Sequence, residues 1–507
     1  MTDMKKRLSI LLLATAAALF PAAASAQYID GEAPAVTDTS GTVVLSLEDA
    51  LKVALSENVS VKVADKEIEK AEYAKKGTYA SLFPQVDATG SYQRTIKKQV
   101  MYMDIDSSAM GGMGTGGSDE SGSDGSDGSD GTDSGDSGSS TSAAGFSVGR
   151  WNTFNAGVSA SLPIVNAQLW KSIQISGDAV ELAVEQARSS RLDMVTQVKQ
   201  AYYAVLLAKE AFKVYKDVYE NAVENFGLAE KKYNAGKASE LEYTRAKANV
   251  AAAVPNVYSS ESQVILALWQ LKAVMGVDLD MDMDVAGSLD DYAAEMRYMS
   301  EDENSDLSGN TSLRQLAIQA EQLAKTVQMQ KYAYLPTLAV SYSYSIYAME
   351  NDFKFSNYKW SPYSYAGLSL SIPIFSGGKR YNDVRQAKVN QAELDLQRVD
   401  TERQLKISVR QYLTSMETDM KSYYSALDAV ELAQKAYDIS TKSFNVGKST
   451  LTDLNDARLT LTQAELSRSQ AVYDYMVAKS NLEKTLGHDF LDDEGSVALD
   501  RLNTNSR

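Results

Sequence analysis

An internal duplication is the feature that most constrains how this chain can fold. The segment LPIVNAQLW, residues 162–170, aligns with IPIFSGGKR, residues 372–380, at an offset of 210 residues. Gly236 aligns with Gly447 at an offset of 211 residues, inside the similar stretches YNAGKASELEYTRA and FNVGKSTLTDLNDA. Self-similarity at one nearly constant offset indicates two copies of one structural unit. We therefore expect a fold built from two similar halves.

The start of the chain has the organisation of a signal peptide. It has a basic start at residues 5–7, an apolar stretch over 8–20, and Ala-Ser-Ala at 24–26. We expect cleavage after residue 26 and export of a mature chain that begins with an extension over 27–44. An uncleaved membrane anchor is the alternative, but the apolar run is too short to span a bilayer comfortably.

Composition excludes several functional classes. The chain has no cysteine and one histidine, His488, so thiolate metal sites, disulfides, histidine triads and multi-histidine metal sites are excluded by count. The formal net charge of −17 argues against nucleic-acid binding. Gly447-Lys448-Ser449 resembles part of a phosphate-binding loop, but Lys442 stands where the loop needs another glycine. We expect no enzymatic activity and no cofactor or metal.

Four segments alternate apolar and small polar residues. In the second copy Leu338, Val340 and Tyr342 alternate with Ala339 and Ser341. A period of two over about ten residues is typical of transmembrane β-strands, although the strands of a soluble hairpin alternate as well. The predicted export and the length of these segments favour transmembrane strands over a soluble hairpin. We expect strands over about 84–96, 150–163, 336–347 and 363–373, and a membrane interface at Phe353, Phe355, Tyr358, Trp360, Tyr363 and Tyr365.

An insertion distinguishes the first copy from the second. Pro84 aligns with Pro336 at an offset of 252 residues, so the first copy holds 42 extra residues before the later anchors. Residues 118–139 consist only of Ser, Gly, Asp, Glu and Thr. Such a composition cannot bury enough apolar surface to fold. We expect an acidic, disordered loop over residues 104–145.

Most of the remaining chain has the pattern of long helices. Apolar residues from Met194 to Phe226 recur at alternating steps of four and three, and those from Leu405 to Val430 repeat the pattern. This spacing is the seam of a coiled coil. A helix of this length extends about 100 Å at about 1.5 Å per residue. We expect long helices over about 167–234 and 379–445, and return helices over 238–275 and 449–485.

The two repeats together supply too few strands to close a barrel. They would cover residues 45–290 and 312–490, with a linker at 291–311 and a tail at 491–507. Each repeat carries one pair of strands, whereas the smallest outer-membrane barrels have about eight strands. Unpaired strand edges could not remain in lipid. The chain must therefore oligomerise, so that two copies supply eight strands and three copies supply twelve.

The chain resembles the TolC-like outer-membrane efflux proteins, in its duplicated plan, its two hairpin tips and the stretch SIPIFSGGKRYNDVRQAKVNQAELDLQ at 371–397. The resemblance implies a mainly α fold with transmembrane β-strands. It implies a homotrimer with a twelve-stranded barrel in the outer-membrane lipid, continued by a twelve-helix barrel through the periplasm. The implied function is the exit channel of a tripartite efflux pump or a type I secretion system. Its implied partners are a periplasmic adaptor and an inner-membrane pump of RND, ABC or MFS type, with no nucleic acid.

Three alternatives are considered on the residues alone. A secreted hydrolase is disfavoured, because no nucleophile motif such as G-x-S-x-G lies in a strand-turn-helix context. A soluble periplasmic coiled-coil scaffold would explain the helices and the signal peptide, but not the alternating strands. A general diffusion porin would need strands over most of the chain. The transported substrate and the class of pump are not encoded in any motif.

The resemblance also implies a gate and docking sites. The gate carboxylates of the family lie six and nine residues after the second tip glycine, which are Asp453 and Asp456 here; the matching positions of the first copy are Glu242 and Arg245. An arginine latch two residues after that glycine is replaced by Ser449, so Arg458 or Arg245 would have to substitute. The alternative for the two aspartates is an acidic helix start favoured by the helix dipole. The expected adaptor-docking residues are Gly236, Lys237, Gly447 and Lys448.

Overall fold

The computed structural model describes residues 36–37, 43–103, 144–299 and 306–488. The expected signal peptide, most of the N-terminal extension, residues 104–143 of the acidic loop and the C-terminal tail lie outside the described residues. Contacts divide the chain into two compact units, which are described separately below. The helical unit comprises the described residues within 1–65, 187–311 and 403–507, and the sheet unit comprises those within 66–186 and 312–402. Both predicted repeats contribute to each unit.

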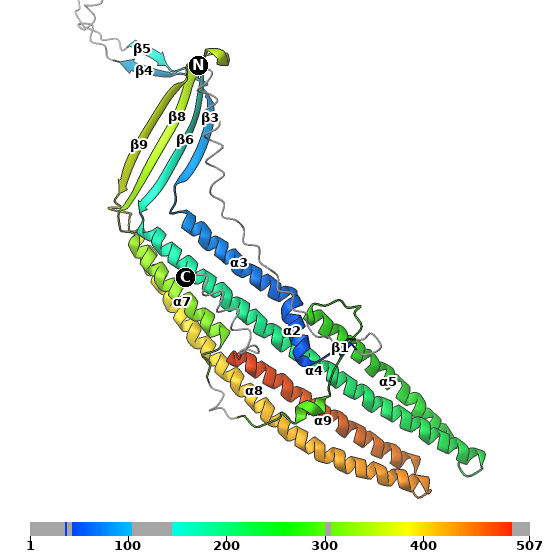
Figure 1. Cartoon of the computed structure of the whole chain (residues 1–507). Helices are drawn as coiled ribbons and strands as arrows, with labels where there is room; N and C mark the ends of the chain where they lie inside the picture. Colours follow the sequence, from blue (N-terminus) through cyan, green and yellow to red (C-terminus); the bar gives the residue numbers. More distant parts are fainter. Residues whose placement is uncertain (1–35, 38–42, 104–143, 300–305, 489–507) are drawn as a thin grey trace, which may run out of the picture. The chain divides into compact units, whose positions relative to one another are not determined.

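A four-stranded antiparallel sheet is the centre of the sheet unit (Figure 1). Its strand order is β3-β6-β8-β9, so the strand pair of the first copy lies beside that of the second. The bounds of all four strands lie within three residues of those predicted from the alternation. The strands are β3 (Gln85–Arg94), β6 (Asn152–Val165), β8 (Thr337–Glu350) and β9 (Ser361–Ser371).

The register of the sheet sorts its side chains onto two different faces. Val86, Ala160, Tyr342 and Ala366 are paired across all four strands. Side chains alternate along each strand, so their neighbours two residues away share this face. We call it the apolar face; it carries Val86, Ala88, Tyr92, Phe154, Ala156, Val158, Ala160, Leu162, Leu338, Val340, Tyr342, Tyr344, Ile346, Ala348, Ala366, Leu368 and Leu370.

The opposite face of the sheet carries mostly small and polar residues, together with Tyr347, Tyr363 and Tyr365. The last two, which were expected at the membrane interface with the other loop aromatics, therefore do not lie on the apolar face. Thr89, Gly157, Ser345 and Tyr363 form one paired row on it. A Cβ added to Gly157 would lie 2.9 Å from the carbonyl oxygen of Tyr344, so the neighbouring strand leaves no room for a side chain there. The outer edges of β3 and β9 have no partner strand among the described residues.

A second, smaller hairpin corrects one end of the predicted acidic loop. Strand β4 (Gln99–Met103) pairs antiparallel with β5 (Ala144–Val148). Residues 144 and 145, which were expected in the loop, are therefore strand. The composition argument failed there because it rested on residues 118–139, whereas 144–148 include Phe146 and Val148.

Helices at one end of the sheet complete the sheet unit. An ion pair of 2.6 Å joins Lys325 to the buried carboxylate of Asp178. The side chain of Gln168 also contacts the carbonyl oxygen of Met329 at 3.5 Å. The helices are α7 (Thr311–Tyr332) and the parts of α3 (Val59–Ala80), α4 (Ala167–Asn234) and α8 (Lys379–Asn445) that fall within this unit.

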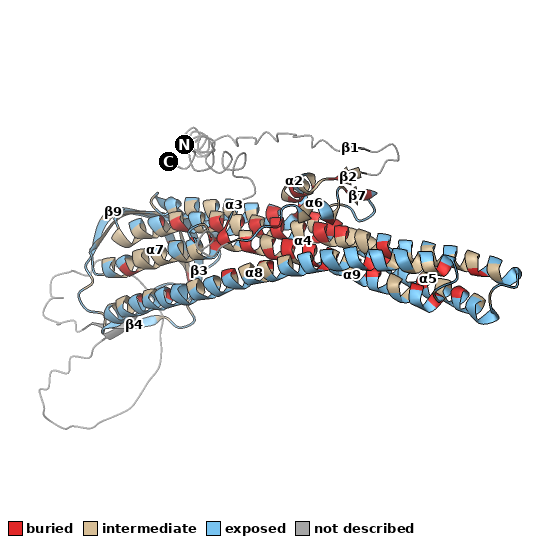
Figure 2. Cartoon of the chain, turned by 90° about the horizontal axis from the view of Figure 1, so that it is seen from below, coloured by how far each residue is buried: buried red, intermediate tan, exposed pale blue. Residues whose placement is uncertain are grey.

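Two long helical hairpins form most of the helical unit. Helix α4 is followed by α5 (Glu240–Met275), and α8 is followed by α9 (Leu451–Leu486). Buried residues gather around α4, α6 and α9, whereas α8 is mostly exposed (Figure 2). The predicted seam is buried at Val198 and Val205 of α4, which are fully inaccessible to solvent. Within the described ranges, no helix is long and apolar enough to cross a membrane.

Short elements that the sequence analysis missed are fastened to the long helices. Strand β2 (Val43–Leu45) lies between β1 (Val36–Thr37) and β7 (Met283–Val285). The hydroxyl of Tyr202 in α4 donates to the carbonyl oxygen of Ala286 at 2.6 Å, and burial raises the pKa of this phenol. Lys209 pairs with Asp284 at 2.6 Å. We call these strands, with α2 (Leu47–Glu57) and α6 (Leu289–Ala293), the belt.

The predicted linker is partly structured, because it too is bound to one of the long helices. Helix α6 begins before residue 291 and continues into the range expected as linker. The hydroxyl of Tyr475 donates to the carbonyl oxygen of Arg297 at 2.8 Å and accepts from its backbone N–H at 3.0 Å. A side chain of α9 therefore satisfies the backbone of this connection.

Two glycines meet where α9 ends. Gly487 ends the helix in the left-handed region, with φ 75°, and a Cβ added there would lie 2.0 Å from the carbonyl oxygen of Gly309. Arg188 donates hydrogen bonds to the carbonyl oxygens of Gly309 and Gly487, at 3.3 and 2.9 Å. The close approach and the positive φ both require glycine at position 487.

Replacing Gly487 with alanine is expected to destabilise the protein by about 2–4 kcal/mol, because the new methyl group clashes with backbone in a strained conformation. Gly227 is the matched control, since it lies inside α4 with open space around it, and Gly227→Ala should be neutral or stabilising by about 0.5–1 kcal/mol. Thermal unfolding followed by circular dichroism at the helix band measures both. Equal midpoints for the two variants would contradict the packing described here.

Candidate functional site

The two hairpin tips have the same backbone turn. Gly236 and Gly447 have φ values of 69° and 74°. The N–H of Lys237 donates to the carbonyl oxygen of Lys232 at 2.7 Å, and the N–H of Lys448 donates to that of Ser443 at 2.8 Å. Each bond closes a helix C-terminus in the way that a left-handed glycine allows. The predicted ends of the long helices, at residues 234 and 445, are confirmed, and both tip lysines are exposed.

The return helix of each hairpin begins with a capping box. The carboxylate of Asp453 accepts hydrogen bonds from the N–H and hydroxyl of Thr450, at 2.9 and 2.8 Å. The N–H of Asp453 donates back to that hydroxyl at 3.2 Å. Ser239 and Glu242 form the same reciprocal pair in the first copy. These bonds satisfy backbone donors that the first turn of a helix leaves free.

The capping box gives Asp453 a structural role of its own. Hydrogen bonds from Thr450 hold the pKa of the Asp453 carboxyl below its usual range, so this exposed group stays charged near neutral pH. Asp456 lies one turn further on and is exposed as well, as is Arg245 in the first copy. The two aspartates therefore present carboxylates close together at the start of α9.

A small apolar cluster joins the two hairpins near their tips. Its buried residues come from all four long helices, and the partly buried side chains of Phe226 and Tyr437 pack against it. Burial of this apolar surface stabilises the contact between the first and second hairpin. The buried members are Ala229, Ala246, Phe444, Leu451 and Leu454.

Lys232 reinforces this cluster by capping the end of α8. Its ammonium group lies 3.4 Å from the carbonyl oxygen of Phe444 and 4.6 Å from the centroid of the Phe444 ring. A cation at a helix C-terminus is favoured by the helix dipole, and the aromatic face adds a cation–π attraction. Thus a side chain from the first hairpin stabilises the tip of the second.

A further contact between the hairpins involves Arg458. The hydroxyl of Tyr437 in α8 donates to Asn221 of α4 at 3.1 Å, and the guanidinium of Arg458 lies 5.4 Å from the Tyr437 ring centroid. The Nε of Arg458 is buried without a hydrogen-bond partner in the part of the chain that the structure describes. Nearby Glu465 has a raised pKa, mainly because of burial, and Arg458 opposes that shift. We call Asn221, Lys232, Tyr437, Phe444 and Arg458 the tip clamp.

Sequence reasoning named Arg458 but missed the rest of the tip clamp. Lys232, Asn221 and Tyr437 have no distinguishing motif, and only the helical period could have placed them facing another helix. The structure brings Arg458 into the contact between hairpins and leaves Arg245 exposed at a helix start.

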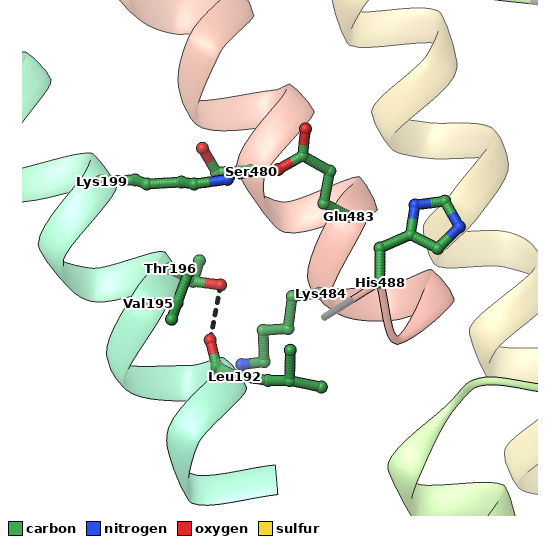
Figure 3. Close-up of a pocket in the computed structure, with 8 residues that line it drawn as sticks. All are labelled: Leu192, Val195, Thr196, Lys199, Ser480, Glu483, Lys484 and His488. Carbon is green, nitrogen blue, oxygen red and sulfur yellow. Dashed lines mark hydrogen bonds and ion pairs between the residues drawn. The ribbon is translucent and has the colours of Figure 1, made fainter. Parts of the chain in front are cut away.

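A cavity of about 380 Å³ between α4 and α9 is a separate feature of the helical unit (Figure 3). Lys199 pairs across it with Glu483 at 2.6 Å, and the hydroxyl of Thr196 donates to the carbonyl oxygen of Leu192 at 2.9 Å. The other residues that line it are Val195, Ser480, Lys484 and His488. Over the residues with described positions, no group of three or more His, Cys, Asp or Glu side chains could hold a metal ion.

Comparison with protein families identifies the class of protein that this fold defines. The family model of the outer membrane efflux protein matches residues 50–277 and 304–488. These ranges cover most of the chain and include both hairpin tips. The chain belongs to the outer membrane efflux protein family. It is therefore an outer-membrane channel protein of efflux or secretion, with a large periplasmic portion.

Individual relatives support this assignment. The chain is 21% identical over 350 residues to the outer membrane protein TolC of Escherichia coli K12, covering 66% of this chain and 70% of that protein. It is 25% identical over 358 residues to the pyoverdine export outer membrane protein OpmQ of Pseudomonas aeruginosa, covering 68% and 72%.

Solved structures show the same fold. The crystal structure of the CmeC outer membrane channel of Campylobacter jejuni matches with a TM-score of 0.64 at 18% identity, covering 90% of this chain and 88% of that one. The open state of the MtrE outer membrane channel of Neisseria gonorrhoeae matches with a TM-score of 0.61 at 17% identity, covering 87% and 88%.

The tip clamp leads to a prediction about local stability. Lys232→Met removes the cap on α8, and we expect amides of residues 440–448 to exchange with deuterium about fivefold faster, a loss of about 1 kcal/mol. The adjacent, exposed Lys231 is the matched control, and Lys231→Met should leave the exchange unchanged. Hydrogen exchange measured by mass spectrometry tests the pair. Equal protection in the two variants would remove Lys232 from the tip clamp.

Proposed function

We propose that three copies of the chain form one channel, a twelve-stranded barrel in the outer membrane continued by a twelve-helix barrel in the periplasm. This channel passively conducts cargo that an inner-membrane transporter of RND, ABC or MFS type delivers through a periplasmic adaptor, in a tripartite efflux pump or a type I secretion system. The observation that carries the proposal is that both units of the chain end in elements that lack a partner. The alternative, a soluble coiled-coil scaffold, does not explain why one face of the sheet exposes many apolar side chains.

The sheet unit supports closure through its edges. Strands β3 and β9 each expose one row of backbone donors and acceptors. An edge strand cannot stay unpaired in hydrocarbon. All pairings in the sheet are antiparallel, so β9 of one copy and β3 of the next have the orientation that continues the pattern. Four strands from each of three copies give twelve, an even number suited to a closed barrel.

The helical unit supports closure through its outer helices. Helices α4 and α9 form the central pair of this unit. They are joined by the ion pair of Lys199 with Glu483 and by the side-chain hydrogen bond of Gln200 with Asn481. Helices α5 and α8 lie on the outside of this pair (Figure 1). Each exposes a row of large apolar side chains, at least half accessible to solvent: Tyr258, Leu266 and Trp269 on α5, and Leu432 and Ile439 on α8.

These two rows suit a head-to-tail contact. Leu432 and Ile439 are seven residues apart, which is the repeat of a coiled-coil seam. When α8 of one copy packs against α5 of the next, two different surfaces meet, and such contacts form a ring if the rotation between copies closes. In the sheet unit, the contact of β9 with β3 of the next copy is of the same head-to-tail kind.

The apolar row on α8 yields the test of oligomerisation. Leu432→Ser with Ile439→Ser should dissociate the detergent-solubilised trimer, because each buried aliphatic side chain contributes about 1.5–3 kcal/mol. Native mass spectrometry at fixed protein concentration measures the fraction of trimer. The control is Val223→Ser with Leu459→Ser, two exposed apolar residues on α4 and α9. A wild-type protein that runs as a water-soluble monomer would contradict the proposed channel.

We place the gate at the second hairpin tip. Three-fold symmetry would gather six carboxylates from Asp453 and Asp456 around the channel axis, where a ring of acidic side chains attracts cations. Glu242 and Arg245 would lie at the corresponding positions of the first hairpin. The tip clamp would hold the hairpins together in the closed state, with Arg458 in the place of the missing arginine latch.

The capping box makes an amide substitution the sharpest test of this gate. Asp453→Asn with Asp456→Asn removes the charge and keeps an oxygen that accepts from Thr450. We expect cation selectivity and block by divalent cations to fall severalfold in planar bilayers, while the loss of two charges at the helix start lowers thermal stability only slightly. Glu242→Gln, which has the same cap in the first copy, separates the contribution of that tip. Unaltered selectivity in the double variant would end the gate assignment.

The tips are also the proposed contact with the adaptor, through Gly236, Lys237, Gly447 and Lys448. Because the chain has no cysteine, cysteines introduced at Lys237 or Lys448 would be the only thiols available for crosslinking. We expect both to form a crosslink to the adaptor in cells, and a cysteine at exposed Lys354 in the sheet unit to form none. Crosslinking from position 354 but from neither tip would contradict the docking proposal.

A further inference from the structure

Positive charge is concentrated at one end of the sheet. The strand ends and turns over residues 92–100, 148–152 and 348–362 contain six Lys and Arg residues and two acidic residues. This excess is unexpected in a chain with a formal net charge of −17. The end concerned is the one away from α3, α4, α7 and α8 in the sheet unit (Figure 1). We call the six residues the basic end: Arg94, Lys97, Lys98, Arg150, Lys354 and Lys359.

Both carboxylates in these turns already have partners. Glu350 forms an ion pair with Arg150. Asp352 accepts a hydrogen bond from the backbone N–H of Lys354 at 3.3 Å. Four cations of the basic end, those other than Arg150 and Lys98, are exposed and form no ion pair with a described residue. Their charge is therefore not neutralised within the described sheet unit.

The loop between β8 and β9 fixes the basic end onto the apolar face. Tyr92 and Phe154 contact each other there, with ring centroids 4.7 Å apart and ring planes tilted by 31°. Phe355 and Tyr358 of the loop each place a ring 5.4 Å from Phe154. The hydroxyl of Tyr358 donates to the carbonyl oxygen of Asp352 at 2.5 Å. The aromatic rings thus hold the loop, with Lys354 and Lys359, over the end of the apolar face.

Strand β3 and the residues that follow it bring further cations to this end of the sheet. Arg94 follows Tyr92 by two residues in β3, so it lies on the apolar face. The ammonium of Lys98 lies 4.9 Å from the ring centroid of Trp151. From Ala88 through Tyr92 to Arg94, apolar, aromatic and cationic side chains therefore follow one another along the apolar face of β3. This order matches the change from acyl chains to charged headgroups across one leaflet of a membrane.

We propose that the basic end binds the phosphate groups of lipid A, the phosphorylated glycolipid of the outer leaflet of the outer membrane. This inference rests on the proposed function, because it requires the apolar face to contact membrane lipid. Lipid A has acyl chains for the apolar face and phosphomonoesters that accept charge-assisted hydrogen bonds from Lys and Arg. The acidic residues of segment 104–143 are another source of negative charge, but that segment has little apolar surface to cover the aromatic rings.

Lipid binding to the purified, detergent-solubilised full chain tests the proposal. The probes are lipid A with both phosphates and the same lipid A with both removed, and native mass spectrometry gives the fraction bound in a titration. We expect the wild type to bind the phosphorylated lipid at least about tenfold more tightly. The variant Arg94→Gln with Lys354→Gln and Lys359→Gln should bind both lipids alike.

A matched variant controls for the loss of three charges. Lys75→Gln with Lys76→Gln and Lys331→Gln removes the same charge from helices α3 and α7, at the other end of the sheet. It should keep the tenfold preference. If it loses the preference as fully as the first variant, the effect is non-specific charge and the proposal is overturned.

Channel conductance in bilayers of phosphatidylcholine separates this proposal from the proposed function. A trimer that conducts but shows no preference for phosphorylated lipid A overturns the lipid site and leaves the channel standing. A protein that neither trimerises nor conducts overturns both. If deleting residues 104–143 creates a preference that the intact chain lacks, the acidic segment occupies the basic end, and the proposal is wrong.

Discussion

Unsatisfied edges are the constraint on which the rest of this structure depends. Backbone N–H and C=O groups must be paired wherever water is absent, and β3 and β9 expose a full row of them. The same deficit occurs among the helices, where apolar side chains of α5 and α8 are left open to solvent. On the proposed account, one chain supplies only part of the wall of a closed barrel. The proposed trimer would pair the strand edges and cover the exposed apolar rows.

The hairpin tips show how one residue can serve the fold and the proposed gate together. Asp453 is held by Thr450 in a capping box, so its carboxylate is charged and fixed in position. In the proposed gate, this fixed charge would attract a cation without any rearrangement of the helix start. The tip clamp then links this helix start to the first hairpin, because Arg458 packs on Tyr437, which in turn contacts Asn221. A movement that separates the hairpins would have to break these contacts.

The sequence predicted the long elements well, because each repeats a period many times. The helix predicted over 379–445 has the same bounds in the structure, Lys379–Asn445, and the strands shifted by at most three residues. The belt was missed because β2 and β7 have three residues each, too few to show a period, and pair across more than 200 positions. The attachment of these segments to α4 involves Tyr202 and Lys209, whose partners no local pattern reveals.

The candidate site also has residues that the sequence could predict and residues that it could not. Gly236 and Gly447 could be recognised because a left-handed helix end needs glycine at one position. Lys232 could not, because its contact with Phe444 depends on how two hairpins pack. The basic end of the sheet also escaped notice, since Arg94 and Lys354 are far apart in the sequence and meet only through the strand order β3-β6-β8-β9.

Disulfide crosslinking between sheet edges tests the central claim most directly. The chain contains no cysteine, so Thr89→Cys on β3 can be combined in turn with Tyr363→Cys, Tyr365→Cys or Gly367→Cys on β9. These residues lie on the polar face near the middle of the edge strands. The account predicts that at least one combination, oxidised in the membrane, yields a ladder that ends at three covalently joined chains. Absence of any chain-to-chain crosslink in all three combinations would contradict it.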